Sequence, residues 1–150
     1  MSNIKQELYQ ACQDLIASRI QGVEQAMQAV QADAAEETKS SAGDKYETGR
    51  AMIHLEMEKL SSQRDEFVKS KKVLEQIDIQ KTTTTIQQGS LIITDSHHYF
   101  LSVSLGQLTV QDRPYFCISP ASPLGQLMLG KKKGDVIIFR TQRFTIKDVI

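Results

Sequence analysis

The sequence has no tryptophan, no excess charge of either sign and no long hydrophobic run, and it has only two cysteines. Eighteen basic and eighteen acidic side chains cancel, which argues against nucleic-acid binding through bulk charge. Cys12 and Cys117 have no second cysteine or closely spaced histidine beside them, so we interpret them as reduced, structural thiols. No run approaches a membrane span, and the N-terminal residues lack the apolar core of an export signal. We therefore expect a soluble cytoplasmic protein with no membrane contact.

Motifs of self-contained catalysis are also absent from the sequence. None of the serines lies in a nucleophile elbow, and no glycine-rich phosphate loop follows a predicted strand. His97 and His98 are adjacent, so in an extended segment they point to opposite faces, which favours surface exposure over a shared metal ion. These absences indicate that the chain has no active site of its own.

Two long amphipathic segments fill the first half of the chain. Their apolar residues recur at heptad spacing, which is typical of helices that pack as a coiled coil. The first series is Ile16, Ile20, Val23, Met27 and Val30, and the second is Tyr46, Ile53, Leu60, Phe67 and Leu74. We expect an antiparallel coiled-coil hairpin over residues 1–77, with arms of roughly 45 Å. The first helix starts at a cap on Ser2 or Asn3 and ends near Ala32, and the second starts at about Asp44.

After residue 78 the pattern changes to short segments that are rich in β-branched and aromatic residues. The predicted strands are 82–86, 91–94, 99–103, 107–110, 115–118, 136–141 and 144–150. Between them, Ser122 and Pro123 mark a helix start, because serine caps free amides and proline at the first position loses no hydrogen bond; Gly130 ends this helix. The sequence thus predicts an α+β fold, in which the hairpin is followed by a β-sheet domain with one short helix over residues 78–150.

A polar connection, residues 33–43, leads to a pair of carboxylates at the start of the second predicted helix. Asp44 and Glu47 are three residues apart, so both lie on one side of its first turn. One interpretation is a capping box, in which each side chain accepts a hydrogen bond from the other residue's amide. The other is a pair of ligands for a divalent cation held mostly by another protein, because Mg²⁺ needs only one or two carboxylates from each contributor. The two are compatible, since a capping carboxylate keeps a second oxygen.

The segment 118–136 resembles the C-terminal signature of the Gre-type bacterial transcript cleavage and elongation factors, the GreA/GreB family. In that family a Ser-Pro-hydrophobic-Gly helix leads to a Gly-Lys-Lys-x-Gly-Asp turn and a closing pair of strands. The matching residues, which the resemblance implicates in docking to a partner, are Ser122, Pro123, Leu124, Gly125, Lys131, Lys132, Gly134 and Asp135. The resemblance implies an FKBP-like C-terminal domain that docks at the rim of the secondary channel of RNA polymerase.

The tip of the predicted hairpin is also similar to this family, in which Gly-Asp-x-x-Glu precedes Asn-Ala-Glu-Tyr. Residues 43–47 read Gly-Asp-Lys-Tyr-Glu, whereas residues 48–51 read Thr-Gly-Arg-Ala. The resemblance implies a monomeric transcription factor, not itself an enzyme, whose coiled coil enters the polymerase channel. Asp44 and Glu47 would act in catalysis by helping to bind Mg²⁺ in the polymerase active centre. The factor would have no cofactor of its own, and it would reach DNA and RNA through the transcription complex.

Three alternatives to transcript cleavage stay open. The departure after the tip motif is compatible with a secondary-channel regulator that does not stimulate cleavage. FKBP-like folds also host peptidyl-prolyl isomerases, although these need an aromatic-lined pocket, and this chain has no tryptophan and 6% aromatic residues. The third alternative is a scaffold whose coiled coil binds some other protein.

Overall fold

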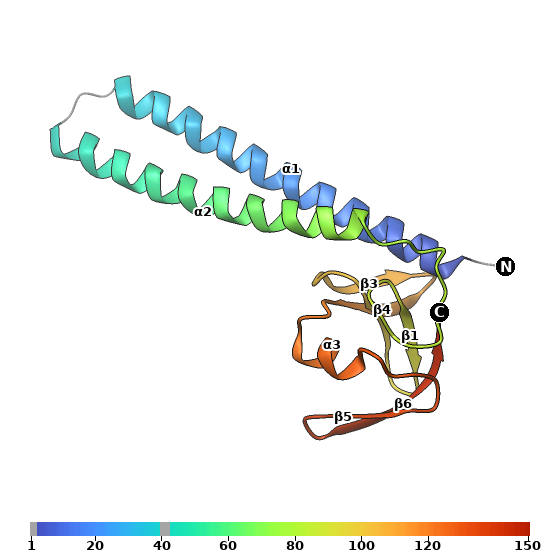
Figure 1. Ribbon diagram of the computed structural model, residues 1–150. Coiled ribbons are helices and arrows are strands. Elements are labelled where there is room, and N and C mark those ends of the chain that lie inside the picture. The colour runs from blue at the N-terminus through green and yellow to red at the C-terminus, as the bar shows by residue number, and fades with distance from the viewer. Residues whose placement is uncertain (1–2, 40–42) are drawn as a thin grey trace. The chain divides into compact units, whose positions relative to one another are not determined.

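The computed structural model describes residues 3–39 and 43–150, with side chains over 3–36 and 48–150. Its elements are α1 (Ile4–Lys39), α2 (Gly43–Glu75), β1 (Leu91–Thr94), β2 (His98–Leu101), β3 (Gly106–Val110), β4 (Arg113–Ile118), α3 (Pro123–Met128), β5 (Val136–Phe139) and β6 (Gln142–Val149) (Figure 1). They form two compact units: a hairpin unit, Leu15–Lys71, and a sheet unit, Met1–Asp14 with Lys72–Ile150.

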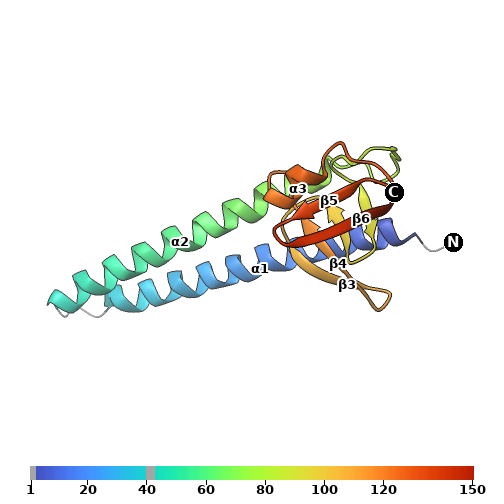
Figure 2. The ribbon, with the colours of Figure 1, turned by 90° about the horizontal axis from the view of Figure 1, so that it is seen from below.

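The hairpin unit contains the parts of α1 and α2 between Leu15 and Lys71, which lie side by side in antiparallel directions (Figures 1 and 2). The seam residues Ile16, Val23 and Leu60 are buried. The half-buried members of the two heptad series are Ile20, Met27, Val30, Ile53 and Phe67. Across the seam, Arg64 Nε donates to Glu24 Oε1 at 3.0 Å. The predicted antiparallel helical hairpin is therefore confirmed, because the heptad spacing puts the apolar residues of each helix on the side that faces the other.

The first helix is longer than the sequence pattern predicted. Asn3 caps it, since Asn3 Oδ1 accepts from the amide of Gln6 at 3.1 Å. The predicted end near Ala32 is wrong: α1 continues to Lys39, so most of the predicted polar connection is helical. The segment 34–39, Ala-Ala-Glu-Glu-Thr-Lys, is rich in strong helix formers, and their propensity extends the helix beyond the last apolar residue of the seam.

The sheet unit contains one six-stranded mixed sheet in the order β3-β4-β2-β1-β6-β5. Strands β2 and β4 are parallel, and every other neighbouring pair is antiparallel. One face packs with α3 into a hydrophobic core whose buried members are Ile86, Ile92, Tyr99, Leu101, Met128, Ile137, Phe144 and Ile146. The predicted α+β fold class is confirmed: a helical hairpin is followed by a sheet that carries one short helix.

The predicted strand at residues 82–86 is wrong. Only Thr85 forms a ladder contact, an isolated bridge with Lys132. Ile86 is buried, and both of its backbone groups pair with the turn after α3: its amide donates to Lys131 O at 2.7 Å, and its carbonyl accepts from Gly130 N at 2.8 Å. The β-branched composition predicted extended backbone, but the hydrogen-bonding partners of this segment belong to a turn rather than to a strand.

The first turns of α1 cover the second face of the sheet. Phe100 lies between two core residues on β2 and therefore points to the opposite face, where it is fully buried. Cys12 on α1 contacts Cys117 on β4. Lys5 is also buried, and its Nζ donates to two backbone carbonyls, those of Lys81 and Ile150, at 3.3 and 3.1 Å. Our predicted hairpin domain included these turns, whereas in the structure they belong to the sheet unit.

Candidate partner-docking surface

The two residues whose carboxylates were predicted at the tip of the hairpin lie in the first turn of α2. Asp44 and Glu47 lie within its bounds, and α2 begins at Gly43, close to the predicted start. Their side chains lie outside the described residues. The capping box, the metal ligation and the catalytic role of this pair therefore stay predictions.

The start of α3 is built as its sequence predicted. Ser122 is the N-cap: its Oγ accepts from Gly125 N at 3.0 Å and donates to Ser119 O at 2.7 Å, and Pro123 follows at the first helical position. Gly125 is buried against the preceding turn, and a Cβ at this position would lie 2.1 Å from Ser119 O. Leu124 packs against the core. This half of the signature thus holds α3 in place.

The turn after α3 has an equally clear structural basis. Gly130 and Gly134 have φ of 79° and 95°, a backbone region that favours glycine. Asp135 Oδ2 accepts from Lys132 N at 2.9 Å, which closes the turn before β5. The side chains of Lys131 and Lys132 remain exposed. Among the docking residues predicted from the signature, the exposed side chains are those of Pro123 and these two lysines, and the lysines are the charged ones.

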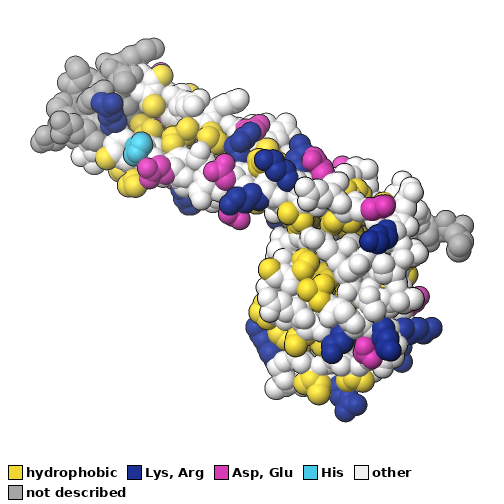
Figure 3. Space-filling model, viewed as in Figure 1, with side chains coloured by type: hydrophobic (Ala, Val, Ile, Leu, Met, Phe, Trp, Pro, Cys, Tyr) yellow, Lys and Arg dark blue, Asp and Glu magenta, His cyan; other side chains and the backbone are white. Residues whose placement is uncertain are grey.

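Sequence reasoning missed the exposed apolar side chains of α3, the turn after it and β5, which flank these lysines in the sequence. We define the α3–β5 surface as the exposed residues Leu127, Leu129, Lys131, Lys132, Val136 and Ile138. Strand β5 is an edge strand, and Ile138 on it is 64% exposed. Figure 3 shows hydrophobic and basic side chains interspersed over the end of the domain that carries β5. The strand reads Val-Ile-Ile-Phe, so its sequence has no alternation from which an outward face could have been predicted.

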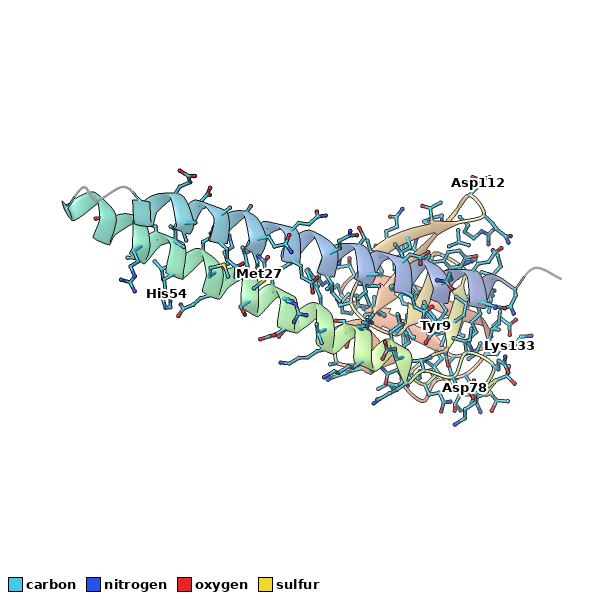
Figure 4. The ribbon with its side chains drawn as sticks, turned by 90° about the horizontal axis from the view of Figure 1, so that it is seen from above. Tyr9, Met27, His54, Asp78, Asp112 and Lys133 are labelled. Atoms are coloured by element: carbon cyan, nitrogen blue, oxygen red, sulfur yellow. The ribbon has the colours of Figure 1, made fainter. Side chains whose placement is uncertain are left out.

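The hairpin unit also exposes apolar side chains. Met52 and Leu55 on α2 are both about two-thirds exposed, whereas Met27 is half-buried. Figure 4 shows Met27 on the side of α1 that faces α2, and His54 on the outer side of α2. His54 Nε2 lies 3.2 Å from Glu58 Oε1, one turn further along the helix. The outer side of α2 is therefore mixed in character, with apolar residues among its charges.

His97 and His98 lie beside a cavity in the sheet unit that Arg113 also lines. His97 is exposed, as predicted, and His98 is half-buried with its ring nitrogens 3.4 and 3.5 Å from Arg113 Nη1. Burial lowers the pKa of His98, and the positive charge of Arg113 lowers it further. Among the residues that the structure describes, no three His, Cys, Asp or Glu side chains are grouped as metal ligands.

Fold and surface together define an α+β protein with a helical hairpin, a mixed-sheet unit and an apolar, basic surface on α3 and β5. Within the described ranges, no helix is long and apolar enough to cross a membrane.

Comparison with solved structures gives a distant likeness. No protein-family model matches the chain, and no curated protein matches it. A solved structure described as that of the transcription factor Gfh1 aligns over 91% of this chain and 92% of its own, with 18% identity and a TM-score of 0.36. A TM-score this low does not by itself establish a shared fold.

Proposed function

We propose that this chain is an RNA polymerase-binding transcription elongation factor. Its hairpin enters the secondary channel of the polymerase, and the α3–β5 surface docks the sheet unit at the channel rim. The factor stimulates the polymerase's own metal-dependent cleavage of backtracked transcripts, and it has no active site of its own. Nucleic acid is contacted through the transcription complex rather than by bulk charge, in keeping with a net charge of zero.

The observation that supports docking is that some residues of the 118–136 signature hold the fold together while others are exposed to solvent. Ser122, Gly125 and Asp135 serve the fold through the helix cap, the close approach and the turn. Apart from Gln126, the side chains that this framework leaves exposed are basic or apolar, among them Lys131 and Leu127. A rigid framework that presents apolar residues beside charges has the composition of a protein-binding surface.

The proposed chemistry at the tip requires only what two carboxylates can supply. Oxygen ligands of this type suit Mg²⁺, which keeps several waters and takes few protein ligands. Asp44 and Glu47 would support the more weakly held Mg²⁺ of the polymerase and orient the attacking water. The polymerase, not this chain, would then hydrolyse the transcript. A secondary-channel regulator that does not stimulate cleavage is the competing proposal, because residues 48–51 depart from the cleavage-factor pattern.

Docking is tested by retention of purified bacterial core polymerase on the immobilised full-length chain. We expect Ile138→Asp, and separately Lys131→Glu with Lys132→Glu, to weaken retention at least tenfold, which corresponds to about 1.4 kcal/mol. Lys147→Glu, another exposed lysine of the sheet unit, is the matched charge control and should bind like wild type. Undiminished binding by both surface variants would refute docking through α3 and β5.

Cleavage is tested by measuring RNA shortening in stalled elongation complexes. The double variant Asp44→Asn with Glu47→Gln should abolish stimulation while it still binds the polymerase. Asp65→Asn with Glu66→Gln removes two exposed carboxylates from the same helix and should stimulate normally. If wild-type protein binds but shortens no RNA, the non-cleaving regulator replaces the cleavage factor. Equal shortening by the tip variant and wild type would remove these carboxylates from the mechanism.

A further inference from the structure

The two cysteines of the chain meet inside the sheet unit. Cys12 on α1 and Cys117 on β4 are 105 positions apart in the sequence, yet their Sγ atoms are 3.5 Å apart. Both are free thiols, with 0% and 1% of their surfaces exposed. Sequence reasoning put them in different domains and did not anticipate the contact.

The packing around the two thiols holds their sulfur atoms close together. Leu8 is one helical turn before Cys12 and is also fully buried, so the apolar side of the first turns of α1 faces the sheet. Cys117 pairs in register with Phe100 on β2, and Phe100 is fully buried as well. Since the neighbouring side chains are large and close-packed, the sulfurs are held near one another.

We propose that Cys12 and Cys117 are a redox pair, which a small-molecule disulfide oxidises to an intrachain disulfide joining α1 to β4. One protein thiolate attacks the oxidant, which forms a mixed disulfide and releases one small thiol. The other protein thiolate then attacks the protein sulfur of that mixed disulfide, which forms the Cys12–Cys117 bond and releases the second small thiol. Both protein protons leave with the departing thiols, and the protein loses the two electrons that the oxidant gains.

The two sulfur atoms are close enough for a disulfide to form after a small movement. A disulfide requires an S–S separation of about 2.05 Å, so the sulfurs must approach by about 1.5 Å, a displacement that side-chain rotation with small backbone shifts can supply. Neither sulfur is accessible in the closed structure. The hydrogen bond with Cys12, together with burial, also raises the pKa of Cys117 well above its usual range. Oxidation therefore proceeds through transient opening of the first turns of α1, and the disulfide then suppresses that same opening.

The test uses the purified full-length chain under native conditions with oxidised glutathione. After acid quenching and denaturation, the number of free thiols should fall from two to zero, with a mass loss of two hydrogens and no glutathione attached. Dithiothreitol should restore both thiols. Cys12→Ala and Cys117→Ala, each first checked for native circular dichroism, should lose the intrachain product. Thiols that stay at two, a stable glutathione adduct on wild type, or a disulfide-linked dimer would each overturn the proposal.

A second measurement distinguishes a redox pair from two cysteines that merely pack together. Hydrogen exchange of the amides in residues 4–14 should slow on oxidation of wild type, because the new bond restrains opening of that segment. Oxidant should leave the exchange of the Cys117→Ala variant unchanged. Equal exchange in oxidised and reduced wild type would contradict the expected effect. Neither measurement involves polymerase, so the proposal stands or falls independently of the proposed function.

Discussion

The substitution Gly125→Ala tests whether the signature segment is a packed framework. The new Cβ would lie 2.1 Å from Ser119 O and 2.9 Å from Ser122 Oγ, where real Cβ contacts stay beyond about 3 Å. Overpacking of this kind costs about 1–3 kcal/mol. Because the side chain that must move is the N-cap, loss of the cap adds about 1 kcal/mol. We therefore expect the free energy of unfolding of the sheet unit to fall by about 2–4 kcal/mol.

Urea titration followed by tyrosine fluorescence measures this loss, since the sheet unit contains Tyr99 and Tyr115 and the chain has no tryptophan. With m near 2 kcal/mol per molar urea, the midpoint should drop by about 1–2 M. Gly22→Ala is the matched control: a Cβ there meets nothing within 4 Å, and the substitution in α1 should stabilise the helix by up to about 1 kcal/mol. A Gly125→Ala midpoint equal to that of wild type would refute the close-packed framework.

Three further predictions concern charged groups. Burial lowers the pKa of Lys5, so the amine of the unfolded chain keeps its proton to a higher pH than the amine of the folded chain. Wild type should therefore gain stability relative to Lys5→Met as the pH rises toward 10.5. Urea unfolding at two pH values measures this gain. Arg113→Gln should raise the pKa of His98, as followed by NMR titration, because it removes one of the causes that lower it. Arg64→Met should cost less than about 1 kcal/mol in thermal unfolding, since its ion pair with Glu24 is partly exposed.

Each of these predictions has a contradicting result. A stability difference between wild type and Lys5→Met that does not change with pH would show that the amine is solvated in the folded state. An unchanged pKa of His98 in the Arg113→Gln variant would remove the electrostatic contribution of that guanidinium. A loss of several kcal/mol in Arg64→Met would mean that this side chain stabilises the hairpin through packing as well as charge.

The hairpin shows which structural features hydrophobic periodicity alone can predict. Heptad spacing predicted which side of each helix is buried, because α-helical geometry fixes the direction of side chains along the chain. It did not predict where α1 ends. The continuation to Lys39 runs through residues of high helix propensity, about which the apolar pattern carries no information.

The sheet unit shows where local patterns fail. The strand predicted at 82–86 is absent because strand formation requires a partner strand, and the backbone of Ile86 pairs with a turn instead. The outward face of β5 was not predictable, since all four of its residues are apolar. Only the pairing of β5 with β6 at the edge of the sheet decides that Ile137 is buried and Ile138 exposed.

The sequence by itself determined the helical hairpin, the start of α3 and the α+β class, because a local pattern predicts each of them: heptad spacing, a capping serine before a proline, and short β-branched segments. Only the tertiary structure decided that the first turns of α1 belong with the sheet, that Lys5 is buried, and that Cys12 meets Cys117. Those contacts join segments more than seventy residues apart, and such pairings depend on how whole elements pack rather than on any local pattern.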